Sequence, residues 1–392
     1  MNDAAQRPVS ATLSRTEHAA SLTAYLEEGC RRAAKIGNKG PLRFGEDGKV
    51  HLDVIKAYWQ HGYYIFEGVV GPEELLELRN GCMDMLERAP ARTGADVDAK
   101  GRPAFGQDLG RPAYYMTKPL SDPHGGTSDL GGRHPTQMSQ PLPDADAPAE
   151  VVLRMYGMCQ AIPAALRIYG NPHLLAVAEA VNGEDFVPFN DVIFVKQPGL
   201  GPSVSWHQDG VTHWDNPEWD EGIHGFNFQV QLFPTTPANA LWIVPGSHKK
   251  GRADIKRLVA ENDGSDQLPD AIPLVCDAGD VTIVNRQTLH SSFANSSPDM
   301  RMSVTFGFHR RRAVLGQIPA LGMEGQKEPM DEARIERRSS VVQVAIDARH
   351  QRLPDDPPFQ YQPFAGREDQ FRFGDATFDR VIRNYNLFDL AI

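Results

Sequence analysis

Alternating apolar and polar positions mark several β-strands in the middle of the chain. The segments 189–196 (FNDVIFVK) and 226–233 (FNFQVQLF) read as alternating β-like runs, and in 301–306 (RMSVTF) each polar residue is followed by an apolar one. A period of two gives a strand one polar face and one apolar face. Short runs of this kind, punctuated by Gly and Pro between residues 185 and 310, predict a β-rich core.

Helical spacing of apolar residues appears on both sides of this β-rich region. It is clearest in 10–36 and 72–88, and the second segment has Pro72 at its start, where proline fits the first turn of a helix. Weaker helical patterns cover 150–182, 330–350 and 375–390. Apolar stripes at this spacing are most often the faces with which helices pack on a sheet. We therefore expect helices outside the β core.

A long segment, 89–150, has neither pattern. It is rich in Gly, Pro and Asp and has few apolar runs, which is typical of an insertion or lid. Tyr114 and Tyr115 are its candidate substrate contacts. We expect three parts in the chain: an N-terminal helical extension (1–49), a β domain with this insertion (50–315), and a C-terminal extension packed on the core (316–392).

A His-x-Asp motif places two metal-binding side chains on one face of a strand. The motif occurs three times, at 51–53, 207–209 and 213–215. The first lies at the lead-in to a predicted helix, where surface or capping roles prevail, and the third lies in a turn-rich stretch without alternation. The motif at 207–209 lies between two strand candidates. We therefore predict that His207 and Asp209 bind a metal ion.

His290 is the candidate for a third ligand on a distant strand. It is the only one of the 13 histidines that is followed by Arg eleven positions later, at Arg301. Two imidazoles and one carboxylate leave coordination positions open, as in non-haem Fe(II) oxygenases. A strand that carries His290 can turn back and present Arg301 inside the same barrel, where a guanidinium would bind the far carboxylate of 2-oxoglutarate.

Ligands that converge from separate short strands favour a double-stranded β-helix. This is the jelly roll of two facing sheets found in cupin-like proteins, and here we expect helices packed outside it. With 392 residues, the chain is long enough for one elaborated barrel of this kind.

The chain resembles the phytanoyl-CoA dioxygenase family of Fe(II)- and 2-oxoglutarate-dependent oxygenases. Four segments carry the resemblance in the family's order: 58–76, 194–210 (FVKQPGLGPSVSWHQDG), 241–249 (LWIVPGSHK) and 289–308 (LHSSFANSSPDMRMSVTFGF). The likeness extends over roughly residues 50–310. The loop 233–240 (FPTTPANA) departs from the family's common form, which concerns the substrate side of the pocket rather than the metal.

The resemblance implies a set of site residues. Iron would be held by His207, Asp209 and His290, and 2-oxoglutarate would be bound by Arg301, Ser292 and Asn227. The family reaction turns 2-oxoglutarate and O2 into succinate and CO2. Because Asp209 is present, no halide can take its place, and hydroxylation of a small molecule is the default outcome. Desaturation or cyclisation by a member of the same family stays open.

Two other classes of protein remain open from the sequence. One is a cupin-like metalloenzyme that does not use 2-oxoglutarate, which would have no need of Arg301. The other is a non-catalytic jelly roll that has kept the motifs.

The composition of the chain narrows the range of its possible binding partners. A formal charge of −11 disfavours nucleic acid and anionic membranes, which attract basic surfaces. No apolar stretch approaches the ~20 residues that span a bilayer, and residues 1–22 lack the apolar core of a signal peptide. We expect a cytoplasmic enzyme. The four cysteines are far apart, which predicts buried free thiols rather than disulfides.

Overall fold

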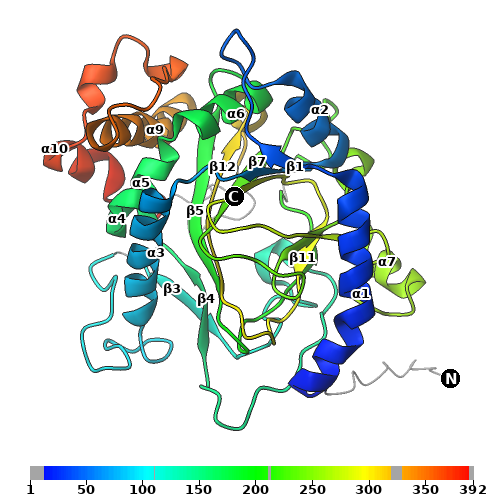
Figure 1. Cartoon of the computed structure of the whole chain (residues 1–392). Coiled ribbons are helices and arrows are strands. Elements are labelled where there is room, and N and C mark those ends of the chain that lie inside the picture. The colour runs from blue at the N-terminus through cyan, green and yellow to red at the C-terminus, as the bar shows by residue number, and fades with distance from the viewer. Residues whose placement is uncertain (1–12, 110, 211–212, 319–328, 388–392) are drawn as a thin grey trace.

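The computed structural model describes residues 13–109, 111–210, 213–318 and 329–387. Its centre is a pair of facing β-sheets, with helices outside them (Figure 1). The larger sheet has eight strands in the order β1-β2-β10-β7-β12-β5-β4-β3. These strands are β1 (Lys39–Pro41), β2 (Tyr63–Glu67), β3 (Tyr114–Thr117), β4 (Val151–Met155), β5 (Val187–Lys196), β7 (Phe226–Gln231), β10 (Val281–Asn285) and β12 (Arg301–His309).

The smaller sheet has four strands in the order β6-β11-β8-β9. They are β6 (Val204–His207), β8 (Leu241–Ile243), β9 (Ile272–Leu274) and β11 (His290–Ser292). From β5 to β12 the chain crosses repeatedly between the two sheets, so strands that follow one another in sequence usually face each other across the barrel. This alternation is the winding of a double-stranded β-helix. The predicted fold class is confirmed.

The barrel strands follow the alternating patterns of the sequence. The run 226–233 contains β7, and the run 301–306 opens β12, whose residues are all buried. On β12, the apolar side chains of Met302, Val304 and Phe306 belong to the main hydrophobic cluster, which lies beneath the helices. The alternate polar positions face the interior of the barrel, where Arg301 and Thr305 line a cavity.

Helices cover the outer face of the larger sheet. The helices α4, α5, α6 and α9 pack against it or against one another, whereas α1 packs on β9 of the smaller sheet (Figure 1). The helices are α1 (Arg15–Ile36), α2 (Leu52–His61), α3 (Pro72–Glu87), α4 (Met158–Ala161), α5 (Pro163–Tyr169), α6 (Pro172–Asn182), α7 (Ile255–Glu261), α8 (Arg311–Val314), α9 (Glu332–Arg352) and α10 (Asp375–Thr377). Shorter helical turns are Asp129–Gly132, Ser247–Lys250, Gln362–Phe364, Glu368–Phe371 and Phe378–Ile382.

Most predicted helices are present, and their ends have local causes. A capping box between Ser14 and Glu17 starts α1, and Gly37 ends it in the left-handed conformation. Pro72 starts α3, as predicted. At 375–390 only α10 and the turn Phe378–Ile382 form, and residues 388–390 lie outside the described part of the chain.

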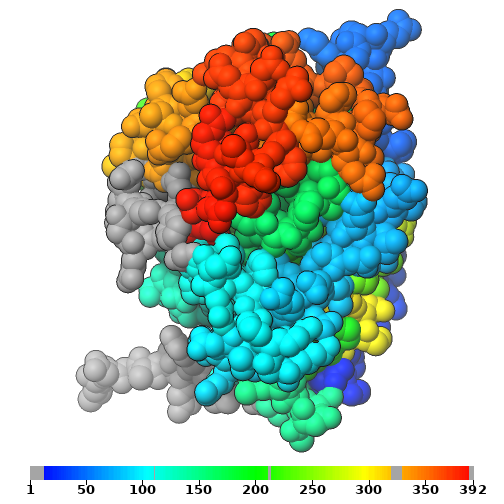
Figure 2. All heavy atoms as spheres, turned by 90° about the vertical axis from the view of Figure 1, so that its left-hand side faces the viewer, coloured from blue at the N-terminus to red at the C-terminus, as the bar shows by residue number. Residues whose placement is uncertain are grey.

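The prediction of helix throughout 150–182 is wrong in its first part. Residues Val151–Met155 form β4, whose buried β-branched residues suit a sheet, and three short helices follow. The segment 89–150 contains, among its described residues, one strand and one helical turn, β3 and Asp129–Gly132. Figure 2 shows this segment in cyan and green, meeting the red C-terminal segment on one face of the molecule. The contact includes a hydrogen bond from Arg111 Nη1 to the Asn386 carbonyl oxygen (3.2 Å).

Two further features are the state of the cysteines and the character of the helices. All four cysteines are free; three are buried, and Cys30 is partly exposed. No helix within the described ranges combines the length and the apolar character that crossing a membrane requires.

Candidate metal centre

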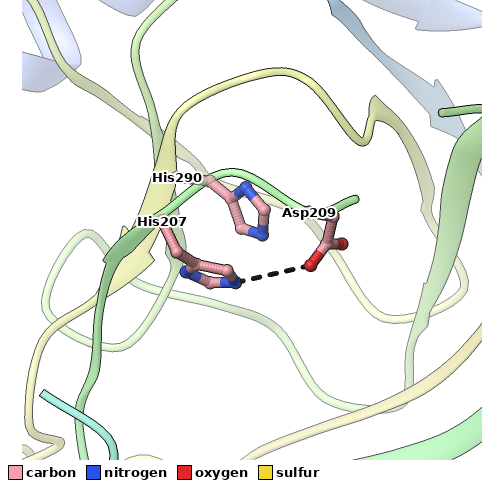
Figure 3. Close-up of side chains that lie close together, drawn as sticks. All are labelled: His207, Asp209 and His290. Atoms are coloured by element: carbon pink, nitrogen blue, oxygen red, sulfur yellow. Dashed lines mark ion pairs between the residues drawn. The ribbon is translucent and has the colours of Figure 1, made fainter. Parts of the chain in front are cut away.

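Two paired strands of the smaller sheet place the three predicted ligands. His207 is the last residue of β6, and its Cα pairs directly with that of His290 at the start of β11. Asp209 lies two residues beyond the end of β6, where its N–H donates to the Arg286 carbonyl oxygen (2.8 Å). The three side chains point toward one another (Figure 3), and their donor atoms all lie within 4.8 Å of one another.

The imidazoles are oriented by backbone carbonyls. The Nδ1 atom of His207 lies 2.8 Å from the Ser205 carbonyl oxygen, and Nδ1 of His290 lies 2.8 Å from that of Thr288. A carbonyl can only accept, so each Nδ1 carries the proton and each Nε2 keeps a free lone pair. The Nε2 atom of His207 lies 3.7 Å from Oδ1 of Asp209. Metal-binding histidines commonly have this orientation, in which one ring nitrogen donates to a carbonyl and the other is left free for the metal ion.

Electrostatics keep the three groups in the protonation states that metal binding requires. Burial lowers the pKa of His207 well below its usual value and also lowers that of His290, so both imidazoles are neutral at pH 7. Burial alone would raise the pKa of Asp209, but the charges of Arg133 and Arg286 outweigh it and hold that pKa below its usual value. A metal ion needs neutral imidazoles and an ionised carboxylate.

Three side chains contact Asp209. Arg133 Nη1 lies 2.9 Å from Oδ1, Asn227 Nδ2 donates to Oδ2 at 3.1 Å, and Arg286 Nε lies 3.6 Å from Oδ2. Asn227 was predicted to contact the co-substrate. In the structure it contacts the carboxylate of the metal site and also lines the adjoining cavity.

The triad opens into a cavity of about 540 Å³ that is also lined by Arg301 and Ser292. Arg301 is the first residue of β12, reached from β11 by a turn, as the spacing predicted. Its Nη2 donates to Gln229 Oε1 (3.2 Å) and its Nη1 to the Asn239 carbonyl oxygen (3.4 Å). Its buried Nε has no hydrogen-bond partner among the described residues. The structure thus brings all six predicted site residues to one cavity.

Sequence reasoning missed several residues of this cavity. Gln229 could have been found, because it lies two positions after Asn227 and therefore on the same face of β7. Lys196 is the register partner of Arg301 on β5, and its buried Nζ donates to the carbonyl oxygens of Pro202 (2.6 Å) and Phe293 (2.5 Å). Arg133 lies in an irregular segment that carries no periodic signal.

A series of neighbouring rings leads from the triad into the segment 89–150. The ring centroids of His207 and His134 are 4.1 Å apart, those of His134 and His124 are 5.6 Å apart, and those of His124 and Tyr115 are 5.3 Å apart. Tyr115, predicted as a substrate contact, lines the cavity, whereas Tyr114 donates a hydrogen bond to the Met85 carbonyl oxygen (2.6 Å) and does not.

The other two His-x-Asp motifs lie elsewhere. His51 is the N-cap of α2, and its side chain accepts from the Asp53 N–H. His213 packs against the ring of His224, with centroids 5.5 Å apart. Within the described residues, the group of side chains with metal-binding spacing is His207, Asp209 and His290.

Comparisons with known proteins find similarity to phytanoyl-CoA dioxygenases. The model of the phytanoyl-CoA dioxygenase (PhyH) family matches residues 157–303, a range that contains the triad and Arg301. Phytanoyl-CoA dioxygenase 1 of Oryza sativa subsp. japonica is 31% identical over 117 residues, which are 28% of this chain and 40% of that protein. Phytanoyl-CoA dioxygenase domain-containing protein 1 of Danio rerio is 24% identical over 275 residues, which are 64% of this chain and 87% of that protein.

The match is therefore partial in length. The chain spans about two fifths of the rice protein (40%) and of phytanoyl-CoA dioxygenase of Arabidopsis thaliana (41%). Among solved structures, the apoform of EctD from S. alaskensis is 16% identical, with a TM-score of 0.47 over 75% of this chain and 90% of that chain. The resemblance that the sequence predicted is confirmed by the family match.

Proposed function

Because residues 157–303 match the phytanoyl-CoA dioxygenase family, we propose that this chain is an Fe(II)- and 2-oxoglutarate-dependent dioxygenase that hydroxylates a C–H bond of a small molecule. The observation that carries the proposal is the joint geometry of two groups. A buried His/Asp/His triad with free Nε2 lone pairs and a buried arginine with an unpartnered Nε line one cavity. A 2-oxoglutarate-independent cupin would have no use for that arginine.

The chain's own residues fit such a metal. His207 and His290 would bind iron through Nε2, and Asp209 through one carboxylate oxygen, while Arg133, Arg286 and Asn227 hold that carboxylate in place. The chemistry that iron and 2-oxoglutarate supply in this family is the reduction of O2 coupled to release of succinate and CO2 and to oxidation of the substrate.

The co-substrate side of the cavity fits a dicarboxylate. Arg301 would bind the far carboxylate with two parallel hydrogen bonds, in a position that Gln229 and the Asn239 carbonyl oxygen already fix. Ser292 lines the same cavity two residues after His290 and would add a hydroxyl donor. We assign Asn227 a double role, holding Asp209 and bordering the co-substrate.

We also propose a division of the chain. Residues 50–315 would form the oxygenase domain, with 89–150 as an insertion that supplies one wall of the cavity. The extension 1–49 contains α1, which packs on β9, and the extension 316–392 contains α9, which packs on α5 and β5. Both contacts support extensions that are packed on the barrel.

The test is a titration of 2-oxoglutarate into the anaerobic, Fe(II)-loaded protein, followed by the weak visible band of a chelated 2-oxo acid. We expect saturable binding in the wild type and, with O2, slow release of succinate. His290→Ala should lose both, whereas His51→Ala, which alters a helix cap far from the triad in sequence, should keep both. A wild-type protein that binds Fe(II) but develops no band would reject 2-oxoglutarate dependence and favour the cupin alternative.

A further inference from the structure

Cationic side chains outnumber carboxylates in the wall of the cavity. Six of them, Arg111, Arg133, Arg154, Lys196, Arg286 and Arg301, line it together with three carboxylates, Asp129, Asp191 and Asp209. This local excess of positive charge lies inside a chain whose formal net charge is −11. A bound Fe(II) and a bound 2-oxoglutarate would carry opposite double charges, so the two together would leave the excess in place.

Three of the cations are already accounted for. Lys196 donates to the carbonyl oxygens of Pro202 and Phe293 and so holds two loops together. Arg301 is assigned to the co-substrate. Arg286 is stacked over the ring of Phe189, 4.2 Å from its centroid, behind Asp209. Arg111, Arg133 and Arg154 remain, and we call them the arginine row.

The arginine row leads away from the metal triad. Arg133 Nη1 lies beside Asp209 Oδ1 at 2.9 Å. Arg154 lies next in the row: it is two residues before Tyr156, whose ring Arg111 covers, and its Nη2 reaches Nε2 of His124. Arg111 lies at the far end, where it donates to the Asn386 carbonyl oxygen of the C-terminal segment.

Two members of the row, Arg111 and Arg154, lack anionic partners, whereas Arg133 is paired with Asp209. Arg154 lies over the ring of Tyr115 (4.4 Å to the centroid), and its Nη2 is 2.8 Å from Nε2 of His124. Arg111 lies over the ring of Tyr156 (4.1 Å). Neither forms an ion pair with any carboxylate of the described residues, and the buried Nε atoms of all three arginines have no hydrogen-bond partner there. A buried donor without a partner destabilises the folded protein, and a bound anion would relieve that cost.

The carboxylates of the cavity are engaged elsewhere. Asp209 belongs to the triad, and Asp191 accepts a hydrogen bond from Asn386. Asp129 lies 3.7 Å from Nδ1 of His124, with more than half of its side chain exposed. None of them forms an ion pair with Arg111 or Arg154, although the charge of Asp191 acts on Arg111 from a distance and opposes the lowering of its pKa by burial. The row is therefore a set of guanidinium donors that lines a cavity of ligand size, together with the co-substrate arginine.

We infer that the substrate of this enzyme is a small anion, a carboxylate or a phosphate monoester, whose charged group binds Arg154 with Arg111 and Arg133 on either side. The rest of the substrate would lie along the neighbouring rings of Tyr115, His124 and His134, which lead to the triad. Guanidinium groups bind either anion with paired hydrogen bonds. This inference rests on the proposed function.

The experiment compares anions with a neutral compound of the same length. Hexanoate, hexyl phosphate and hexanamide are titrated into the anaerobic protein loaded with Fe(II) and 2-oxoglutarate, and binding is followed by the change in the visible band and by the unfolding temperature. We expect at least one anion to bind tenfold or more tightly than the amide. Arg154→Gln should reduce this preference to threefold or less, and Arg154→Lys should keep part of it.

Controls separate this inference from the proposed function. Arg257→Gln, on an exposed face of α7, should leave the preference unchanged. The affinity for 2-oxoglutarate is measured in every variant, and Arg154→Gln should keep it within threefold of the wild type. If the wild type develops the visible band but shows no preference for the anions, or binds none of the three compounds, this inference alone is overturned. The same holds if Arg154→Gln loses affinity for 2-oxoglutarate rather than the preference for anions. No band in the wild type would reject the proposed function itself.

Discussion

At the scale of single residues, the charge balance around Asp209 is the main feature of the site. This buried carboxylate has two arginines and one amide within 3.6 Å. A buried carboxylate without such partners would favour its neutral form. Because these partners keep Asp209 ionised, the site does not have to release a proton from this residue when a metal ion binds at neutral pH.

Arg301 gives the first residue-scale prediction. Arg301→Ala would leave the far carboxylate of 2-oxoglutarate buried without a partner, so we expect binding to weaken by about 2–5 kcal/mol. Arg301→Lys restores the charge but not the planar pair of donors, and should recover only part of this loss. Titration of 2-oxoglutarate into the anaerobic Fe(II) protein measures both. The exposed Arg31→Ala is the control, and unchanged affinity in Arg301→Ala would remove this residue from the site.

Asp191 gives a pH-dependent prediction. Burial raises the pKa of this side chain to about 6, although hydrogen bonds from Asn386 and Cys159 lower it. An unfolded Asp has a pKa of about 3.9. Between about pH 4 and pH 6 the unfolded chain has therefore lost a proton that the folded chain keeps, so the free energy of unfolding falls as pH rises through this window.

The size of this effect follows from the shift. Two pKa units correspond to about 3 kcal/mol. Asp191→Asn should remove this component, so that the stability of the variant relative to the wild type increases from pH 4 to pH 6 and is constant above it. Denaturation at a series of pH values measures the difference. Asp84→Asn, at an exposed position of α3, is the matched control. A parallel pair of profiles for Asp191→Asn and wild type would contradict the prediction.

At the scale of elements, the contact between α5 and α9 joins the C-terminal extension to the barrel. Gly170 follows α5 and comes close to the backbone of α9. A Cβ at this position would lie 2.3 Å from the Ala345 carbonyl oxygen and 2.6 Å from the Ile346 nitrogen. These are backbone atoms in the interior of a helix, so they cannot move alone, and the absence of a side chain is what lets α9 pack this closely.

Gly170→Ala should therefore destabilise the protein by pushing α9 away from the sheet. We expect a loss of about 1–3 kcal/mol in the free energy of unfolding, the usual cost of overpacking. Chemical denaturation measures it. Gly71→Ala, at the N-cap of α3 with open space around its Cβ, should cost less than about 1 kcal/mol. Equal effects of the two substitutions would show that α9 is not held in this position.

At the scale of the whole molecule, the metal site should be linked to global stability. The triad joins β6 and β11 of the smaller sheet and is buried in the barrel, so a metal ion that binds it binds the folded state. Mn(II), an ion suited to imidazole and carboxylate ligands, at 100 times its Kd should increase the free energy of unfolding by about 2.7 kcal/mol.

Thermal or chemical unfolding with and without Mn(II) tests this linkage. His290→Ala should show no stabilisation by the ion, whereas His51→Ala should show the same stabilisation as the wild type. Stabilisation of His290→Ala to the wild-type extent would place the ion elsewhere in the molecule.

The sequence by itself determined the local parts of this protein. Strands such as 226–233 and 301–306 are visible because burial of one face leaves a period of two in the sequence. The spacing of His207 to Asp209 and of His290 to Arg301 is visible because each pair is close in the chain: Asp209 lies two residues beyond β6, and Arg301 opens β12, the strand that follows β11. Such signals depend on neighbours in the chain, which a sequence displays directly.

Only the tertiary structure decided which distant residues complete the cavity. Arg111 and Arg133 lie in irregular stretches, and Arg154 lies on β4, in a segment whose pattern predicted helix. They line the same cavity because β3 and β4 extend the larger sheet past β5, which brings the segment 89–150 over the barrel. A contact between residues that are far apart in the sequence leaves no periodic pattern in it. The position of these arginines, and with it the charge of the cavity, follows from packing alone.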